Sequence, residues 1–264
     1  SSCKNKLTFS IENNKVLLTC CGRILNINIE HYDKLRQLAR HQIKLHRRNR
    51  SDFDETSFHR RLYVLLQRYK TFGGTGFQAA LPKEVFHVLT KEFDVCCEAF
   101  ASPLNCHFPH FCSAFCDTDN YFGSVGSFFD FKPRFGSYEV NPPFVSSVVV
   151  RMMNHMCELL SYAERDSLPL CFVIIVGASC DGIERLSSEI WNRTTMRVSR
   201  KDHCYIEGAQ HIVSCIGSGS SSSSTRSSNK KRKKRRGDKK IKQVRTRTST
   251  CDTMVYFWQS SKAQ

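Results

Sequence analysis

Two consecutive prolines near the middle of the chain constrain its fold more than any other feature. Pro142 and Pro143 follow a short strand-like segment, residues 135–140, and precede a Val-rich stretch that can open a helix. Proline fixes φ and has no backbone N–H, so neither residue can continue a strand ladder. The sequence therefore predicts a strand that ends at a rigid turn and is followed directly by a helix.

The residues beside the prolines carry chemistry of their own. The side-chain amide oxygen of Asn141 is a hydrogen-bond acceptor, and the carbonyl of Asn141 or Pro142 is a second one. Two such acceptors can hold both hydrogens of an exocyclic amine, such as N6 of adenine, whose lone pair is delocalised into the ring. Phe144 offers an apolar face on which a base can stack. The alternative interpretation is a Pro-Pro turn with a purely structural role.

The pattern of apolar and polar residues along the rest of the chain predicts an α/β fold. Residues 7–29 alternate apolar and polar positions around Asn13-Asn14, which is typical of a β-ribbon with a tight turn. Helical periodicity follows at residues 31–50 and 58–69. From residue 95 onwards helices and strands alternate, which favours a mostly parallel sheet. We expect a helix at 144–163 and strands at 95–101, 112–115, 135–140, 168–176 and 254–258.

Positive charge is concentrated in one segment. The net charge is +16, and residues 230–247 hold 12 Lys or Arg and one Asp, so they supply +11 of it. A Ser-rich stretch precedes them, and we expect residues 217–248 to form a disordered insertion. The run Lys230–Arg236 predicts a nuclear-import signal, and hence a nuclear location, or attraction to RNA phosphates; a solvated loop without a partner is the alternative. Arg36 and Arg40, on the first helix, indicate an RNA surface or a solvated helix face.

Several other classes of protein receive little support. No run reaches the ~18–20 apolar residues of a membrane span, and no secretory signal is visible, so we expect no membrane partner. The cysteines show no regular disulfide spacing and are interpreted as reduced thiols. A metal site would draw on the cysteines and histidines between residues 106 and 116, but their spacing is not that of a zinc ribbon or finger, so no metal is predicted. A Cys/His nucleophile built from His203, Cys204 and His211 lacks an orienting group.

Several motifs together resemble the phosphorylated-CTD-interacting-factor family of cap-specific adenosine-N6 methyltransferases. They are Gly74-Thr-Gly-Phe-Gln78, Leu81-Pro82, Phe100-Ala-Ser-Pro-Leu-Asn105, Cys112-Ser-Ala-Phe115, Asp117-Thr-Asp119, Tyr121-Phe-Gly-Ser124, Asn141-Pro-Pro-Phe144 and Gly208-Ala-Gln-His211. The resemblance covers roughly residues 58–212 and the last strand. It implies a Rossmann-like S-adenosylmethionine-dependent core, residues 71–264, with an N-terminal β-ribbon and helical extension, residues 1–70. It also implies methylation of N6 of the first transcribed adenosine beside the 7-methylguanosine cap of mRNA.

The same resemblance suggests site residues. The catalytic set is Asn141, Pro142, Pro143 and Phe144. The expected cofactor-binding residues are Phe100, Ser102, Pro103, Leu104, Asn105, Asp117, Asp119, Phe122, Gly123 and Glu139. The expected RNA-binding residues are Gln78, Gly208, Gln210 and His211, together with Arg36 and Arg40. A carboxylate at Asp117 or Asp119 could accept from ribose hydroxyls, and an Asx-type turn is the alternative for each.

Limits of the resemblance leave alternatives open. Family members carry a WW domain that binds the polymerase tail, and none is visible here, so a polymerase-tail partner is not predicted. Residues 177–181 depart from the family pattern on the substrate side, which leaves mono- and dimethylation both open. Asn141 is neutral, so the released proton is expected to leave to water without a strong general base. A catalytically inactive RNA-binding scaffold is the alternative function.

Overall fold

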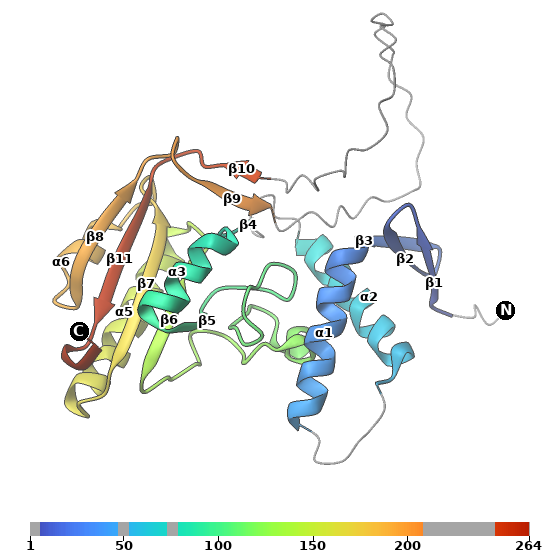
Figure 1. Ribbon diagram of the computed structural model, residues 1–264, viewed down its shortest axis with the longest axis horizontal. Coiled ribbons are helices and arrows are strands. Elements are labelled where there is room, and N and C mark those ends of the chain that lie inside the picture. Colours follow the sequence, from blue (N-terminus) through green and yellow to red (C-terminus); the bar gives the residue numbers. More distant parts are fainter. Residues whose placement is uncertain (1–5, 47–52, 73–78, 208–245, 264) are drawn as a thin grey trace, which may run out of the picture.

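A computed structural model describes residues 6–46, 53–72, 79–207 and 246–263. These residues form a five-stranded sheet with helices on its two faces, and a lobe of N-terminal strands and helices beside it (Figure 1). The fold class is therefore mixed α/β, as the sequence predicts. Within the described part of the chain, no helix has both the length and the apolar character needed to cross a bilayer.

The central sheet has the strand order β5-β6-β7-β11-β8. The strands are β5 (Val95–Glu98), β6 (Gly136–Val140), β7 (Leu170–Gly177), β11 (Thr253–Gln259) and β8 (Asn192–Val198). β5, β6 and β7 pair in parallel, whereas β11 pairs antiparallel with both β7 and β8. The prediction of a mostly parallel sheet thus holds for β5–β7, and the reversed strand β11 was not predicted.

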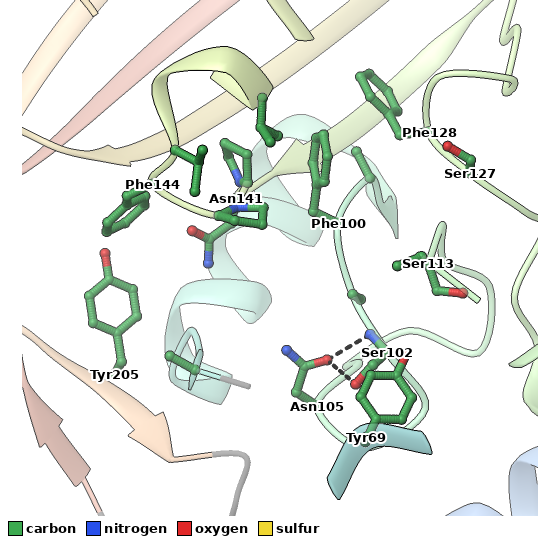
Figure 2. A pocket seen from close by; sticks show the side chains of 18 of the residues that line it. Tyr69, Phe100, Ser102, Asn105, Ser113, Ser127, Phe128, Asn141, Phe144 and Tyr205 are labelled. Carbon is green, nitrogen blue, oxygen red and sulfur yellow. Dashed lines mark hydrogen bonds between the residues drawn. The ribbon is translucent and has the colours of Figure 1, made fainter. Parts of the chain in front are cut away.

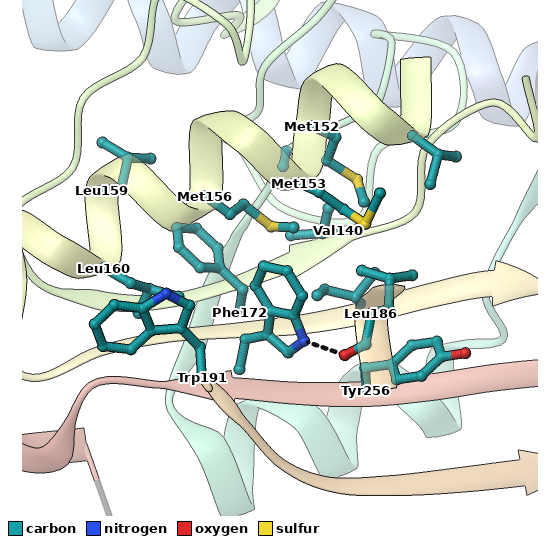
Figure 3. Packing of buried hydrophobic residues seen from close by; sticks show 14 of the residues in the cluster. Val140, Met152, Met153, Met156, Leu159, Leu160, Phe172, Leu186, Trp191 and Tyr256 are labelled. Atoms are coloured by element: carbon teal, nitrogen blue, oxygen red, sulfur yellow. Dashed lines mark hydrogen bonds between the residues drawn. The ribbon is translucent and has the colours of Figure 1, made fainter. Parts of the chain in front are cut away.

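β7 lies at the centre of two cores. Phe172, Ile174 and Val176 face α5 (Ser146–Arg165), where the methionines of the helix point toward the sheet (Figure 3). Cys171 and Val173 face the opposite side, in the cluster that includes residues of α3 (Lys83–Phe93). Because both faces are covered, the strand is continuously apolar, as buried parallel strands usually are. α6 (Glu184–Ser188) closes one edge through a 2.9 Å hydrogen bond from Trp258 Nε1 to the Leu186 carbonyl.

The N-terminal lobe confirms the predicted β-ribbon and two helices. β1 (Thr8–Glu12), β2 (Lys15–Cys20) and β3 (Arg23–Asn28) form an antiparallel sheet. Asn13 and Asn14 have φ values of 48° and 63°, the left-handed conformation that suits a tight hairpin turn. α1 (Ile29–His46) and α2 (Glu55–Phe72) then pack on this sheet.

Two predicted segments differ from the structure. Residues 112–115 are not a strand: the backbone of Cys112 bonds to Glu98 and Ala101, and that of Ser113 to Gly126, all in loops or at a strand end. Residues 112–115 are mostly apolar because they are packed among loops, not because they pair with a neighbouring strand. The predicted insertion at 217–248 also extends too far, because Thr246–Thr248 form β10, which pairs with β9 (Cys204–Glu207) beside β4 (Ala79–Ala80). Residues 217–245 lie outside the described residues.

Candidate active site

The double-proline turn joins β6 to α5 at the carboxyl end of the sheet. β6 ends at Val140 and α5 begins at Ser146, with the Val145 N–H donating to the Pro143 carbonyl at 2.7 Å. Pro142 is buried, whereas the Phe144 side chain is 45% exposed. Because β5, β6 and β7 are parallel, the loops that follow them meet at this edge, where open α/β sheets bind ligands.

A cavity of about 660 Å³ opens at this edge. Its wall includes the whole Asn141–Phe144 turn and, from the loop after β5, Phe100, Ser102 and Asn105 (Figure 2). The structure therefore brings together seven of the residues that the sequence suggested for catalysis and cofactor binding. Aromatic rings and small polar groups alternate around the cavity, a composition typical of small-molecule sites.

The loop after β5 is held by Asn105. Its Oδ1 accepts from the backbone N–H of Ser102 at 2.7 Å and from the Ser102 hydroxyl at 2.9 Å (Figure 2). The oxygen of Asn105 thus fixes the loop, and its amide nitrogen is the part of the side chain that can donate to a ligand.

Comparison with known proteins identifies the family. The family model described as "Phosphorylated CTD interacting factor 1 WW domain" matches residues 34–208. This protein belongs to the phosphorylated-CTD-interacting-factor family. Two proteins named mRNA (2'-O-methyladenosine-N(6)-)-methyltransferase, from Homo sapiens and Mus musculus, are each 36% identical over 215 residues. That region is 76% of this chain and 29% of each relative, so the chain spans less than a third of the length of these two family members.

Seven further cofactor residues suggested by the family resemblance do not line the cavity. Leu104 and Phe122 are buried in the core of the N-terminal lobe. Gly123, with φ of 115°, lies so close to the Pro109 carbonyl that a Cβ atom would clash with it. The others are Pro103, Asp117, Asp119 and Glu139. Pro103 belongs to the loop after β5 and is buried.

Asp117 and Asp119 contact α2 instead of the cavity. Asp117 forms a 2.6 Å ion pair with Arg68. Asp119 is fully buried and accepts from the Tyr69 hydroxyl at 2.7 Å. Burial raises the pKa of Asp119, and hydrogen bonds from Tyr69, Ser113 and Thr118 offset part of that rise. Asp119 thereby orients Tyr69, whose ring does line the cavity.

Glu139 lies inside the sheet beside Glu98. The two residues are partners in the parallel β5–β6 register, and both are at least 96% buried, with 4% exposure for Glu98 and 2% for Glu139. Glu98 Oε2 accepts the backbone N–H groups of His107 and Phe108 at 2.6 and 2.9 Å. Burial, followed by repulsion from Glu98, raises the pKa of Glu139 well above its ordinary value. Glu139 is thus a buried structural neighbour of the site rather than a cavity residue.

The expected RNA-binding residues divide into two groups. Arg36 and Arg40 both pair with Glu55 and lie over the ring of Phe53, so one of their two positive charges is balanced within the lobe. Gln78, Gly208, Gln210 and His211, and the basic run Lys230–Arg236, lie outside the described residues.

Several cavity residues were not recognised from the sequence. β9 contributes Tyr205 and the β10 region contributes residues 247–250, while Ser113, Ser127 and Phe128 come from loops between β5 and β6. Arg247 belongs to the insertion, residues 217–248, that we expected to be disordered, and Tyr205 lies beside the unassigned His203 and Cys204. Loop residues carry no periodicity, so only the family motif around Cys112–Phe115 could have pointed to this wall.

The alternative metal and nucleophile sites gain no geometric support. Among the described residues, no three His, Cys, Asp or Glu side chains are grouped as metal ligands would be. Cys106 is buried with its thiol directed to the Pro103 carbonyl, and the His107 ring stacks on Phe86. His203 bonds to Thr253 and to the Ser199 carbonyl, not to a thiol.

Proposed function

We propose that this chain is the catalytic part of an S-adenosylmethionine-dependent RNA methyltransferase with a Rossmann-like core. Its acceptor is N6 of the cap-adjacent first transcribed adenosine of mRNA. The observation that carries the proposal is the cavity that places the Asn141–Phe144 turn opposite the loop after β5. The names of the human and mouse relatives support the same reaction.

The cavity suits a nucleoside-bearing sulfonium. Its volume lies in the range of about 300–1,000 Å³ that is usual for ligand pockets. Phe100 and Phe128 provide apolar and π faces, which also attract a cation, and Ser102, Asn105 and Ser113 provide polar contacts. S-adenosylmethionine would supply an activated methyl group on a good, neutral leaving group, so the protein mainly has to position the acceptor.

Asn141 and the turn carbonyls hold the acceptor amine. Their oxygens accept its two hydrogens and direct the nitrogen lone pair away from the base ring and toward the methyl group. The prolines keep those carbonyls fixed and available. Phe144, which is 45% exposed beside the cavity, is positioned to stack on the adenine.

The proposal extends to features that lie beyond the cavity. Residues 1–70 act as an N-terminal extension and residues 71–264 as the methyltransferase domain, and Lys230–Arg236 bind an import receptor that directs the protein to the nucleus. Recruitment to the polymerase tail is not part of the proposal. An inactive RNA-binding scaffold is the competing function, and the complete turn beside a ligand-sized cavity favours the enzyme.

A methyl-transfer assay tests the proposal. Labelled S-adenosylmethionine is supplied with capped RNA that starts with A, capped RNA that starts with G, and uncapped RNA, and nucleosides are analysed by mass spectrometry. We expect transfer to capped A-start RNA only, with loss of at least about 100-fold in Asn141→Ala, because positioning effects reach that size. Asn154→Ala, an exposed amide on α5, is the matched control.

Measurements of S-adenosylmethionine and RNA binding distinguish the methyltransferase from the inactive scaffold. If Asn141→Ala binds S-adenosylmethionine and RNA as the wild type does but transfers no methyl group, the turn is the amine clamp. Wild-type protein that binds RNA and shows no transfer to any of the three RNAs would support the scaffold instead.

A further inference from the structure

A chain of three hydrogen-bonded side chains leads from the cavity wall to the half-buried His203. Tyr205 Oη lies 3.0 Å from Thr253 Oγ1, and Thr253 Oγ1 lies 2.8 Å from His203 Nε2. His203 Nδ1 lies 2.8 Å from the Ser199 carbonyl oxygen. Tyr205 lines the cavity, and Figure 2 shows its hydroxyl pointing toward Phe144, on the side where Asn141 lies.

The direction of each hydrogen bond follows from the bond between His203 and the Ser199 carbonyl. A carbonyl oxygen only accepts, so Nδ1 of His203 must carry a hydrogen. In the neutral ring Nε2 then has no hydrogen and accepts from the Thr253 hydroxyl. Because Thr253 has a single proton, which is donated to His203, its oxygen accepts from Tyr205. The Tyr205 proton therefore points away from the cavity, and its oxygen is left as an acceptor toward the cavity.

Strand pairing and burial hold these three side chains in place. Thr253 is 4% exposed and is paired on one side with Gly177 of β7 and on the other with Val198 of β8. Tyr205 is 6% exposed, and its ring packs edge-on against His203. Burial raises the pKa of the Tyr205 phenol, so the phenol gives up its proton only as it receives another.

We propose that Tyr205, Thr253 and His203 form a relay that removes the proton released from the acceptor nitrogen during methyl transfer. This inference rests on the proposed function, and it replaces the expectation that the proton leaves directly to water. Tyr205 is the catalytic residue of the relay because it reaches the cavity, and Thr253 and His203 act through it.

The steps balance. As the C–S bond breaks and the N–C bond forms, the sulfur keeps the C–S electron pair and the nitrogen becomes positively charged. One N–H bond then breaks, and its electron pair stays on nitrogen. The proton moves to Tyr205 Oη while the original Tyr205 proton moves to Thr253 Oγ1 and the Thr253 proton moves to His203 Nε2. The His203 imidazolium releases a proton to water, and rotation of the two hydroxyls restores the starting arrangement.

Conservative substitutions test the relay. Tyr205→Phe and Thr253→Val remove a hydroxyl, and His203→Gln keeps an acceptor for Thr253 but has no basic site. We expect each to lower the single-turnover rate about tenfold, less than the roughly 100-fold or more that is usual for acid–base catalysis, because water can partly substitute. The affinities for S-adenosylmethionine and RNA and the thermal midpoint should stay close to wild type. Thr253→Ser, which keeps the hydroxyl, should retain the wild-type rate.

The matched controls are residues that do not line the cavity. Tyr162→Phe alters an exposed tyrosine on α5, and His87→Gln alters an exposed histidine on α3; both should leave the rate unchanged. The double variant Tyr205→Phe/His203→Gln should be no slower than Tyr205→Phe alone, because members of one relay act as a unit.

Several outcomes would overturn the relay. Wild-type rates in Tyr205→Phe and His203→Gln would show that the proton takes another route, while the proposed function would stand. If the rate losses of the two single variants multiply in the double variant, Tyr205 and His203 act separately. If the variants lose affinity or thermal midpoint rather than rate, their roles are structural. If Thr253→Val fails to fold, the other two variants decide the question. Absence of methyl transfer by the wild type would overturn the proposed function and the relay together.

Discussion

At the scale of single residues, Glu98 and Glu139 place two carboxyl groups inside the sheet. Glu98 has the partners that favour ionisation, namely two backbone N–H groups and the nearby charge of Lys34, although burial still raises its pKa to about 7. Burial also raises the pKa of Glu139 well above its ordinary value, and repulsion from Glu98 adds to that rise. Burial thus favours the protonated form of both carboxyl groups, and Glu139 lies two residues before the Asn141–Phe144 turn.

This pair predicts a pH-dependent stability. Both native pKa values lie above the ordinary 4.5, so the native state binds these protons more tightly than the unfolded chain does. The stabilisation is complete below about pH 4.5 and is lost as pH rises through the native pKa values. Glu139→Gln should make the free energy of unfolding fall less between pH 5 and pH 8 and should raise it at pH 8, because the amide has no carboxyl proton to lose.

Denaturant unfolding between pH 5 and pH 8 measures the effect. Glu158→Gln, an exposed carboxyl on α5, is the matched control and should follow the wild-type curve. Equal slopes for Glu139→Gln and the wild type would mean that Glu139 is not the group that retains the proton.

Single residues also show how far sequence reasoning reaches into the site. Asn141 and Phe144, which line the cavity, could be selected as candidates because the proposed chemistry of the turn is contained in four consecutive residues. Tyr205 and Arg247 could not, because their strands approach the cavity only through pairing with distant segments. Asp119 was expected at a ribose, and its burial against Tyr69 depends on the packing of α2, which no local pattern encodes.

At the scale of elements, the end of β7 and the Asn141–Phe144 turn are in contact. A Cβ atom added to Gly177 would lie 3.0 Å from Cδ2 and Cε2 of the Phe144 ring and 3.0 Å from Sγ of Cys251. Glycine at this position therefore lets the Phe144 ring lie directly on the backbone of β7. This contact falls where the sequence departs from the family pattern, which links that departure to the placement of the stacking ring.

Gly177→Ala should displace Phe144 without disturbing the cofactor side. We expect kcat/KM for RNA to fall about tenfold, because small displacements of positioning groups have effects of this order or larger. The affinity for S-adenosylmethionine, measured by calorimetry, should change little. Cys251→Ala in the same chain makes room on one side and should restore part of the loss, while RNA kinetics unchanged by Gly177→Ala would contradict the contact.

Elements differ in how well the sequence predicts them. β7 and α5 are buried, so their apolar patterns are continuous or helical and predict them well. β8 is mostly exposed and its sequence, Asn-Arg-Thr-Thr-Met-Arg-Val, has no apolar alternation, so it was missed. The reversal of β11 also has no local signal, since an apolar strand reads the same in either direction.

At the scale of the whole molecule, the N-terminal lobe shares its core with the loop after β5. Leu104, Cys106, Phe111 and Phe122 pack in one cluster with residues of α1, α2, β2 and β3. Lys34 Nζ donates to the Cys106 carbonyl at 2.6 Å, and Tyr69 reaches from α2 to the cavity. The segment that the sequence presents as an extension therefore supports the wall of the site.

This shared core predicts that the lobe and the sheet unfold together. Both tryptophans, Trp191 and Trp258, lie in the sheet core, so their fluorescence reports only on that part. Leu65→Ala in the lobe, at a fully buried position, should lower the free energy of unfolding by about 2–5 kcal/mol. Because the lobe and the sheet share a core, the tryptophan transition should shift as far as the helical signal in circular dichroism. Val64→Ala, a half-exposed neighbour on the same helix, should shift neither, whereas a tryptophan transition unmoved by Leu65→Ala would mean that the two parts unfold independently.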